Sequence, residues 1–395
     1  MDLILENCRA FYRGKLQRMW IGIDGGKITA ASEGKIKTPA ARTVNCAGMA
    51  VIPAAIDAHV HFRTPGFEYK EDWKTGSAAA AAGGVAKVFD MPNTKPATTT
   101  QQALDEKMKI ASAGSWIGFG MHFGATERNI AELKKVQGVN SFKVYLGSQY
   151  GDLFVGDGKK LKEIFEIAKA RGFVVCVHAE DRGEEKGVIE RALEVRREVG
   201  NKLHVCHVST KDGTRAIVRE KKSAKGLLTC EVCPHHLLLT EDDSERLGNF
   251  SSVSPPLRTR ADAKALWEAL AEGTIDCLSS DHAPHTRGDK AKGANGMPGV
   301  QTMLPLMIDA VNQKKITMRK LVEVSSRNPA RIFGLRGKGE IRTGFDADLA
   351  VVDMGREHEI RNSEQMSKCG WTPFDGKRIK GVVVKTIVKG EVVYG

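Results

Sequence analysis

The feature that most constrains the fold is an alternation of short apolar runs with helical patterns through the middle of the chain. Such runs of β type occur eight times: "MAVIPAAIDAHVHF" from Met49, "VAKVFDMPN" from Val85, "WIGFGMHFGA" from Trp116, "SFKVYLGS" from Ser141, "FVVCVHAE" from Phe173, "KLHVCHVST" from Lys202, "LLTCEVCPHH" from Leu227 and "TIDCLSSDHAP" from Thr274. Short continuous apolar runs are typical of parallel strands buried on both faces.

Stretches with helical patterns separate these runs. Five clear examples are "EDWKTGSAAAAAGG", "TTTQQALDEKMKIASAG", "KKLKEIFEIAKARG", "STKDGTRAIVREKKSAKG" and "ADAKALWEALAEG". Several begin with Ser, Thr or Asp and end at Gly, which are the residues preferred at the two ends of a helix. Eight strand–helix units predict an α/β fold, a (β/α)8 barrel of the TIM type.

The two ends of the chain have a different pattern. Short strand patterns alternate there with Gly turns, and no helical period is present. The segments are residues 3–32, "GEIRTGFDADLAVVD" and the last run, "RIKGVVVKTIVKGEVVYG". Edge strands need partners, and pairing the two termini with each other supplies them. We therefore predict a small β-sandwich-like domain of residues 1–50 and 338–395, beside a catalytic barrel of residues 51–337.

Composition excludes several classes of protein. No apolar run is long enough for a transmembrane helix, and the first residues lack the pattern of a signal peptide, so we expect a cytoplasmic protein without membrane contact. The eight cysteines are scattered, which favours reduced core residues over a disulfide scaffold. The net charge of +12 is spread out and not interleaved with aromatic residues. It therefore favours an anionic small substrate over nucleic acid.

Ionisable residues gather at the predicted ends of the strands, where barrel enzymes place their active sites. These residues are His59 and His61 in the first strand, Asn93 after the second, Lys143 in the fourth, His178 in the fifth, His207 in the sixth, and Asp281 and His285 after the eighth. Side chains two positions apart share one face of a strand, so His59 and His61 point the same way. Imidazole binds zinc and similar metals, and the further histidines and the aspartate favour a metal site over a merely hydrogen-bonded strand end.

Lys143 is unusual because it interrupts an apolar strand. A buried ammonium is costly unless it is paired or modified. A neutral amine can add carbon dioxide to give a carbamate, an anion able to bridge two metal ions. The alternatives are a lysine that extends to solvent and a salt bridge to Asp281.

Taken together, "DAHVHFRTPG", "DMPNT", "FKVYLGS", "VHAED", "HVCHVST", "CEVCPHHL" and "SSDHAPHT" resemble the dihydroorotases of the amidohydrolase superfamily over essentially the whole chain. The resemblance implies reversible hydrolysis of (S)-dihydroorotate to N-carbamoyl-L-aspartate, the third step of pyrimidine biosynthesis, by a metal-bridged hydroxide. The sequence leaves open whether the chain forms a homodimer and whether an aspartate transcarbamoylase partner docks to it.

The resemblance also assigns site residues. Two zinc ions would be held by His59, His61, carbamylated Lys143, His178, His207 and Asp281, with Asp281 as the general base and acid. Arg63, Asn93 and His285 would bind substrate, and Pro298 and Gly299 would offer backbone contacts to the ring. Because some members use an aspartate instead of the lysine, Asp152 and Asp157 are alternative ligands. Ser254 is a further candidate for substrate contact.

The cysteine motif "CEVC" has the spacing of a zinc knuckle, but its second half is missing, and a structural core is the better interpretation. Cys206 and Glu231 lie near the predicted site and could hold a third zinc. We expect His235 and His236 to form hydrogen bonds within their loop.

Three other functions fit parts of this pattern. Allantoinase and dihydropyrimidinase or hydantoinase would share the metal ligands, but their substrates lack the ring carboxylate that Arg63 is suited to bind. A non-catalytic scaffold in a pyrimidine-synthesis complex would be expected to lose metal ligands, and here all the positions are filled.

Overall fold

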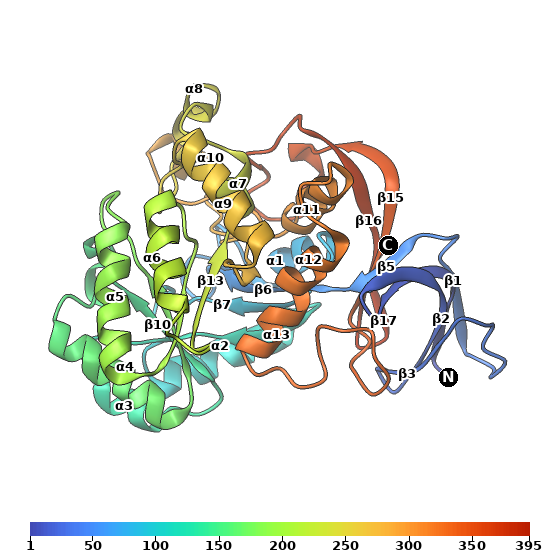
Figure 1. Cartoon of the computed structure of the whole chain (residues 1–395), viewed down its shortest axis with the longest axis horizontal. Coiled ribbons are helices and arrows are strands. Elements are labelled where there is room, and N and C mark those ends of the chain that lie inside the picture. Colours follow the sequence, from blue (N-terminus) through green and yellow to red (C-terminus); the bar gives the residue numbers. More distant parts are fainter.

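The computed structural model describes all 395 residues, as a barrel of parallel strands with surrounding helices beside a sheet of terminal strands (Figure 1). The barrel strands are β6 (Ala55–Val60), β7 (Val85–Asp90), β8 (Gly118–Met121), β9 (Phe123–Gly124), β10 (Ser141–Tyr145), β11 (Val174–His178), β12 (Lys202–Val205), β13 (Leu228–Val232) and β14 (Cys277–Leu278). Strands β6 to β8 pair in parallel in chain order, and so do strands β9 to β14.

Two sets of contacts close the barrel. The third predicted run divides at His122 into β8 and β9, and the His122 amide donates to Asp90 O of β7. On the other side, a parallel bridge joins Val60 of β6 to His282, four residues beyond β14. The predicted α/β barrel is thus confirmed, and its core is a cluster of 66 buried residues.

Helices cover the outside of the barrel. They are α1 (Trp73–Ala82), α2 (Gln101–Gly114), α3 (Ile130–Lys135), α4 (Gly158–Arg171), α5 (Lys186–Val199), α6 (Lys211–Lys221), α7 (Pro234–Leu238), α8 (Asp243–Leu247), α9 (Arg260–Glu272), α10 (Arg287–Ala291), α11 (Met303–Asn312), α12 (Met318–Val322) and α13 (Asn328–Ile332). Short 3-10 or π turns are η1 (Ser148–Leu153), η2 (Gly248–Ser251), η3 (Glu323–Arg327) and η4 (Asn362–Glu364).

The five helices predicted from the sequence begin at their capping residues, and all end where the pattern indicates except α6, which stops at Lys221 and not at Gly226. The Thr100 side chain accepts from Ala103 N at the start of α2, and Thr259 and Asp262 form a reciprocal capping box at the start of α9. Helices α4 and α9 stop at Gly172 and Gly273, which adopt positive φ angles of 70° and 89°.

The terminal strands form one continuous eight-stranded sheet. They are β1 (Leu3–Tyr12), β2 (Lys15–Asp24), β3 (Lys27–Ser32), β4 (Arg42–Asn45), β5 (Ala50–Pro53), β15 (Leu349–Glu359), β16 (Arg378–Val388) and β17 (Glu391–Tyr394). The order β17-β16-β15-β5-β1-β2-β3 joins the two termini through β15 and β5, and β4 pairs with β1. A β-rich unit built from both ends is therefore confirmed, with its own core of 15 buried residues.

The structure corrects our interpretation of the run from Met49 as one barrel strand. Residues 50–53 form β5, which pairs with β1 and β15 of the terminal sheet, and only β6 enters the barrel. Between them, the Ala54 amide donates to Asp348 O. Because Pro53 has no amide proton, the chain can change partners here without losing a hydrogen bond. The sheet therefore extends three residues beyond residue 50, where we began the barrel.

Part of the C-terminal segment also leaves the terminal sheet. Residues 360–377, between β15 and β16, pack against the barrel, where Ile360, Trp371 and Phe374 share a buried cluster with Val253 and Met297. The segment thus reaches the barrel rim. No helix of the structure has the length and apolar character needed to cross a membrane.

A buried ion pair supports the carboxyl end of β7. Nζ of Lys107 in α2 lies 2.5 Å from Oδ2 of Asp90, both side chains are fully buried, and Asp90 Oδ1 accepts from the Phe62 amide.

Removing the cation of Lys107 would leave an unpaired buried carboxylate at Asp90. We expect Lys107→Met to lower the free energy of unfolding by about 3–5 kcal/mol, measured by denaturant titration. Lys109→Met, on the exposed face of the same helix, is the control; equal effects of both variants would contradict the prediction.

Candidate metal centre and active site

A cavity of about 200 Å³ opens at the carboxyl ends of the barrel strands. Its lining includes most of the residues predicted from the strand ends, together with side chains from the loops that follow. The lining residues are His59, His61, Arg63, Asn93, Lys143, Tyr145, Gln149, Tyr150, His178, His207, Val253, Ser254, Asp281, Ala283, Asn295 and Gly296.

His59, His61 and Asp281 bring three ligand atoms together at the ends of β6 and β14. Nε2 of His61 lies 3.1 Å from Oδ1 of Asp281, and Nε2 of His59 lies 3.4 Å from the same oxygen. One ligand atom from each residue lies within 4.8 Å of the others, and all three side chains are buried. The group has the ligand types and the spacing of a metal site.

The other ring nitrogen of each histidine faces a hydrogen-bond acceptor. Nδ1 of His59 lies 2.5 Å from Oε1 of Glu231, and Nδ1 of His61 lies 2.6 Å from Oδ1 of Asn93. Because these oxygens accept, each Nδ1 carries a proton and donates it, and each Nε2 is directed toward Asp281. Metal-binding histidines are commonly oriented in this way.

His178 and His207 form a second pair of candidate ligands. Nδ1 of His178 lies 2.8 Å from Nε2 of His207, and Oε2 of Glu180 lies 3.3 Å from the other nitrogen of His178. Nδ1 of His207 is buried and has no partner. Burial lowers the pKa of both rings. Two neutral rings whose nitrogens approach this closely can share one proton or bind a common cation.

Lys143 is completely buried on β10 and makes no ion pair. Its Nζ donates to Sγ of Cys206 at 3.1 Å and lies 5.2 Å from the centre of the Tyr145 ring. No carboxylate lies within 4.0 Å of it, so the predicted alternative of a salt bridge to Asp281 is wrong, and so is that of a lysine extending to solvent. A buried amine without a carboxylate partner is unfavourable unless it is paired in another way or modified.

Two carboxylates dominate the electrostatics around His59 and favour a positive charge there. Burial and the charge on Lys143 oppose protonation of His59, yet the carboxylates of Asp281 and Glu231 raise its pKa to about 10. Burial lowers the pKa of His61 to about 4. Burial alone would raise the pKa of Asp281, but His59 and His61 hold it well below its usual range. Two carboxylates thus flank His59.

Three residues of the site have backbone conformations that non-glycine residues rarely adopt. The φ angles of Arg63, His207 and Asp281 are 63°, 33° and 44°. Left-handed conformations cost about 1–3 kcal/mol and persist where surrounding contacts hold them, often at functional sites. Here they turn the chain at the ends of three barrel strands.

Arg63 lines the cavity, and its guanidinium is only partly hydrogen-bonded to the protein. Its Nε donates to Pro284 O at 3.0 Å, and Nη2 lies 3.0 Å from Nε2 of His285. Nη1 makes no hydrogen bond with the protein, although Arg63 lines the cavity. His285 lies behind Arg63, where it also contacts Asn295 O at 2.9 Å and Lys70 Nζ at 3.1 Å.

Some predicted contacts lie elsewhere. Pro298 and Gly299 do not line the cavity, because the Gly299 amide donates to Nδ1 of His282, and Asn295 and Gly296 occupy that position. Asp152 forms an exposed ion pair with Arg128, and Asp157 caps α4. These two aspartates are therefore excluded as substitutes for Lys143.

The cysteine motif does not form a knuckle. Cys230 lies within β13 and Cys233 precedes α7, and both are buried. Cys233 lies near His235 and His236, while a separate group contains His59, Cys206 and Glu231. Nε2 of His236 contacts Pro255 O at 3.0 Å, as expected for that loop, but Nε2 of His235 has no partner.

Sequence reasoning missed several residues that surround the cavity. Tyr145 is two positions after Lys143 on β10, so strand alternation could have placed both on one face. Tyr150 and Gln149 come from the following loop, and OH of Tyr150 lies 3.3 Å from Nδ1 of His178. Ser254, by contrast, was a candidate from the sequence; it lines the cavity and its Oγ donates to Oε2 of Glu180 at 2.7 Å. No local pattern marks the loop residues.

Comparison with known proteins gives a consistent result. The model of the amidohydrolase family matches residues 50–393. The dihydroorotase of Methanosarcina mazei is 38% identical, with all of this chain and 94% of that protein covered. The dihydroorotase of Halobacterium salinarum is 39% identical, covering 95% of this chain and 93% of that protein.

Solved structures give close matches of the whole chain. The L-hydantoinase (dihydropyrimidinase) from Arthrobacter aurescens has a TM-score of 0.95 at 32% identity, covering all of this chain and 96% of that one. The dihydropyrimidinase from Brevibacillus agri has a TM-score of 0.92 at 25% identity, covering all of this chain and 95% of that one.

Proposed function

The chain belongs to the amidohydrolase family, and we propose that it is the member that interconverts (S)-dihydroorotate and N-carbamoyl-L-aspartate. The curated relatives named dihydroorotase are similar to it over 93% or more of its length. The observation that carries the proposal is Arg63, which lines the cavity together with the metal-ligand candidates and whose Nη1 has no hydrogen-bond partner in the protein. A guanidinium there matches a substrate with a carboxylate.

Two groups of residues support a binuclear zinc centre. We propose that His59, His61 and Asp281 would hold one ion, that His178 and His207 would hold the other, and that a modified Lys143 would supply a further anionic ligand. The oriented imidazoles and the unpartnered Nδ1 of His207 fit such ligation. When bound, two ions of this kind polarise a carbonyl and lower the pKa of water.

Lys143 supplies the bridging group by reaction with carbon dioxide. The neutral amine forms a nitrogen–carbon bond, one proton leaves the nitrogen, and the product is a carbamate with one negative charge. Lys143 is completely buried and has no carboxylate partner, a setting in which modification of the amine is favourable. The carbamate oxygens then replace the carboxylate ligands that Asp152 and Asp157 do not provide.

Asp281 moves the proton of the reaction. In hydrolysis, a bond forms between water oxygen and the ring carbonyl carbon, and the bond from that carbon to the ring nitrogen breaks. Asp281 accepts a proton from water and delivers one to the departing nitrogen. Before the reaction its carboxylate is ionised between His59 and His61, because these rings hold its pKa well below the usual range although burial alone would raise it.

The proposed substrate contacts come from residues that follow β6, β7 and β14. We propose that Nη1 of Arg63 binds the ring carboxylate and that His285 keeps Arg63 in place from behind. Asn93 lines the cavity beside His61 and offers its amide nitrogen to the same carboxylate. His285 thus acts on the substrate through Arg63.

Cys206 and Glu231 provide a third set of donors around His59. A third zinc there would displace the proton shared by His59 Nδ1 and Glu231. The hydrogen bonds that Glu231 accepts from His204, Ser279 and the His207 amide fit an orienting carboxylate equally well. Metal analysis of Cys206→Ser distinguishes a third zinc site from an orienting role of Glu231. Two ions per chain in both the variant and the native protein would favour the orienting role.

Hydantoinases are the nearest alternative because they supply the similar solved structures. The identity to the solved L-hydantoinase is 32%, against 38–39% for the two dihydroorotases described above. The scaffold alternative is disfavoured because every predicted metal-ligand position retains a competent side chain at the cavity.

Replacing Arg63 separates substrate binding from chemistry. We expect Arg63→Met to raise the KM for dihydroorotate by roughly tenfold to a hundredfold, since a hydrogen bond to a charged group is worth about 1.5–3 kcal/mol. The KM for dihydrouracil, which lacks the carboxylate, should stay the same. Initial-rate measurements on both substrates check this, with Arg128→Met on the surface as the control. An unchanged KM for dihydroorotate would remove Arg63 from the substrate contact.

Purified protein tests the proposed function in both directions. Ring closure consumes one proton, so N-carbamoyl-L-aspartate should cyclise faster relative to ring opening as the pH falls. Failure to convert either compound after zinc loading would reject the function.

The homodimer and the aspartate transcarbamoylase partner stay predictions. The mass of the protein in solution checks the first, and co-elution with aspartate transcarbamoylase checks the second.

A further inference from the structure

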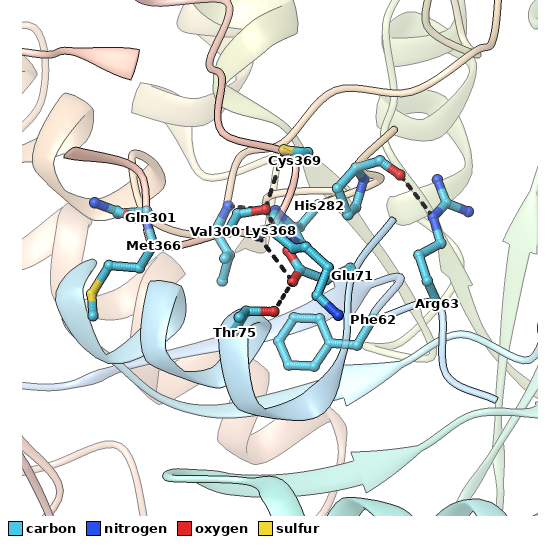
Figure 2. Close-up of polar contacts among 12 residues, drawn as sticks. Phe62, Arg63, Glu71, Thr75, His282, Val300, Gln301, Met366, Lys368 and Cys369 are labelled. Carbon is cyan, nitrogen blue, oxygen red and sulfur yellow. Dashed lines mark hydrogen bonds and ion pairs between the residues drawn. The ribbon is translucent and has the colours of Figure 1, made fainter. Parts of the chain in front are cut away.

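Glu71 is a fully buried carboxylate behind the cavity, in the loop between β6 and α1. Its Oε2 lies 3.2 Å from Nε2 of His282 and accepts from Ser367 Oγ, while Oε1 accepts from Thr75 Oγ1. Burial alone would raise the pKa of Glu71, but hydrogen bonds from His282 and Ser367 hold it below the ordinary value. Figure 2 shows Glu71 between α1, His282 and the segment with Lys368 and Cys369.

His282 transmits this contact to the strand end that carries Asp281. Nδ1 of His282 accepts from the amides of Gly299 and Val300 at 3.1 and 3.4 Å. The proton of the ring is therefore on Nε2, which donates to Glu71. The His282 carbonyl accepts from the His61 amide at 2.8 Å, and its backbone bridges Val60 and Met297. The residue next to Asp281 is thus fixed on both sides.

Glu71 also contacts the loop that carries Arg63. Its backbone carbonyl accepts from Thr64 Oγ1 at 3.2 Å, directly after Arg63 in the chain. Arg63 and Asp281 both have positive φ angles that need support from their neighbours. One buried residue therefore reaches the neighbours of the proposed substrate clamp and of the proposed proton carrier.

The segment Met366–Cys369 belongs to the C-terminal part of the chain, far from the barrel in sequence. The Met366 amide donates to Oε1 of Gln301 at 2.8 Å, and Nε2 of Gln301 donates to Glu364 O. Farther along, Nε1 of Trp371 donates to His285 O at 2.8 Å. The segment is anchored at several points of the rim, and Ser367 is the part of it that reaches Glu71.

We propose that Glu71 and Ser367 are positioning residues that hold the strand end of Asp281 and the loop of Arg63 in their reactive geometry. The C-terminal segment therefore contributes to the reaction without contacting substrate. The kinetic part of this inference rests on the proposed function. Misplacement of a reacting group by about 1 Å can cost roughly a hundredfold in rate, so small losses of support should be visible in kcat.

The kinetic test compares Ser367→Ala and Glu71→Gln with Ser363→Ala, which changes an exposed serine within residues 360–377. We expect kcat for dihydroorotate to fall by about tenfold in the first two variants. Zinc content and melting temperature should stay as in the native protein. Equal kcat in Ser367→Ala and Ser363→Ala, or a loss of kcat that follows lost metal or a lower melting temperature, would overturn the proposal.

A second measurement does not depend on the substrate. The amides of His61 and Ala283 donate to His282 O and Met297 O, so their hydrogen exchange reports how firmly the strand end is held. Exchange in these peptides should be about tenfold faster in Ser367→Ala than in Ser363→Ala. If dihydroorotate is not a substrate, the proposed function fails while this result still supports the positioning role. Identical exchange would contradict the role itself.

Discussion

Lys143→Ala should abolish turnover and reduce the metal content. The variant loses the only candidate for a bridging anion, because Asp152 and Asp157 point away from the cavity. We expect kcat to fall by at least about a thousandfold, as for removal of a metal-assisted water activation. Zinc should fall from two ions per chain to one or none. Steady-state kinetics and elemental analysis of the same preparation measure both quantities.

The cause is tested by adding back a carboxylate. The alanine variant leaves space next to Cys206 and Tyr145 where the lysine chain lay. A small acid such as propionate should therefore restore part of the activity and the zinc content, because it replaces the carbamate and not the amine. Lys159→Ala, on the exposed first turn of α4, is the control. Full activity with two bound ions in Lys143→Ala would show that no carbamate is needed.

Asp281→Asn should separate proton transfer from metal binding. The amide keeps the shape of the side chain and one oxygen for the ion, but it cannot accept a proton. We expect kcat to fall by about a hundredfold to ten-thousandfold, the usual contribution of a positioned acid or base. The KM should change little. Asp105→Asn, on the exposed face of α2, is the matched control.

The metal content distinguishes two explanations of this result. If Asp281 acts as the proton carrier, Asp281→Asn loses turnover while retaining most of its zinc. Loss of both ions together with activity would show that its main role is to hold the metal. Turnover within a factor of about three of the native rate would contradict any role in proton transfer.

Much of the architecture could be predicted from local patterns. Runs such as "FVVCVHAE" are short and apolar throughout, which only a strand buried on both faces explains, and their number fixed the barrel. His59 and His61 alternate correctly on one strand, and the position of Asp281 after the eighth strand follows from the barrel itself. The positions of these side chains follow from the direction and the two-residue period of the strands, and both can be predicted from short stretches of sequence.

Other parts depend on contacts between residues far apart in the chain. The hydrogen bond between His59 and Glu231 joins positions 172 apart, so no spacing could distinguish an orienting carboxylate from a ligand. Ser367 reaches Glu71 only because residues 360–377 leave the terminal sheet. Pro298 and Gly299 were misplaced because the loop after β14 returns through Asn295 and Gly296 before it bonds to His282.

The most direct measurement is a comparison of substrates on one zinc-loaded preparation. Hydrolysis of dihydroorotate, hydantoin, dihydrouracil and allantoin is followed under identical conditions and expressed as kcat/KM. Arg63 at the cavity predicts that dihydroorotate exceeds each neutral ring by at least about tenfold, the value of one charged hydrogen bond. Faster turnover of hydantoin, dihydrouracil or allantoin would contradict the proposed function.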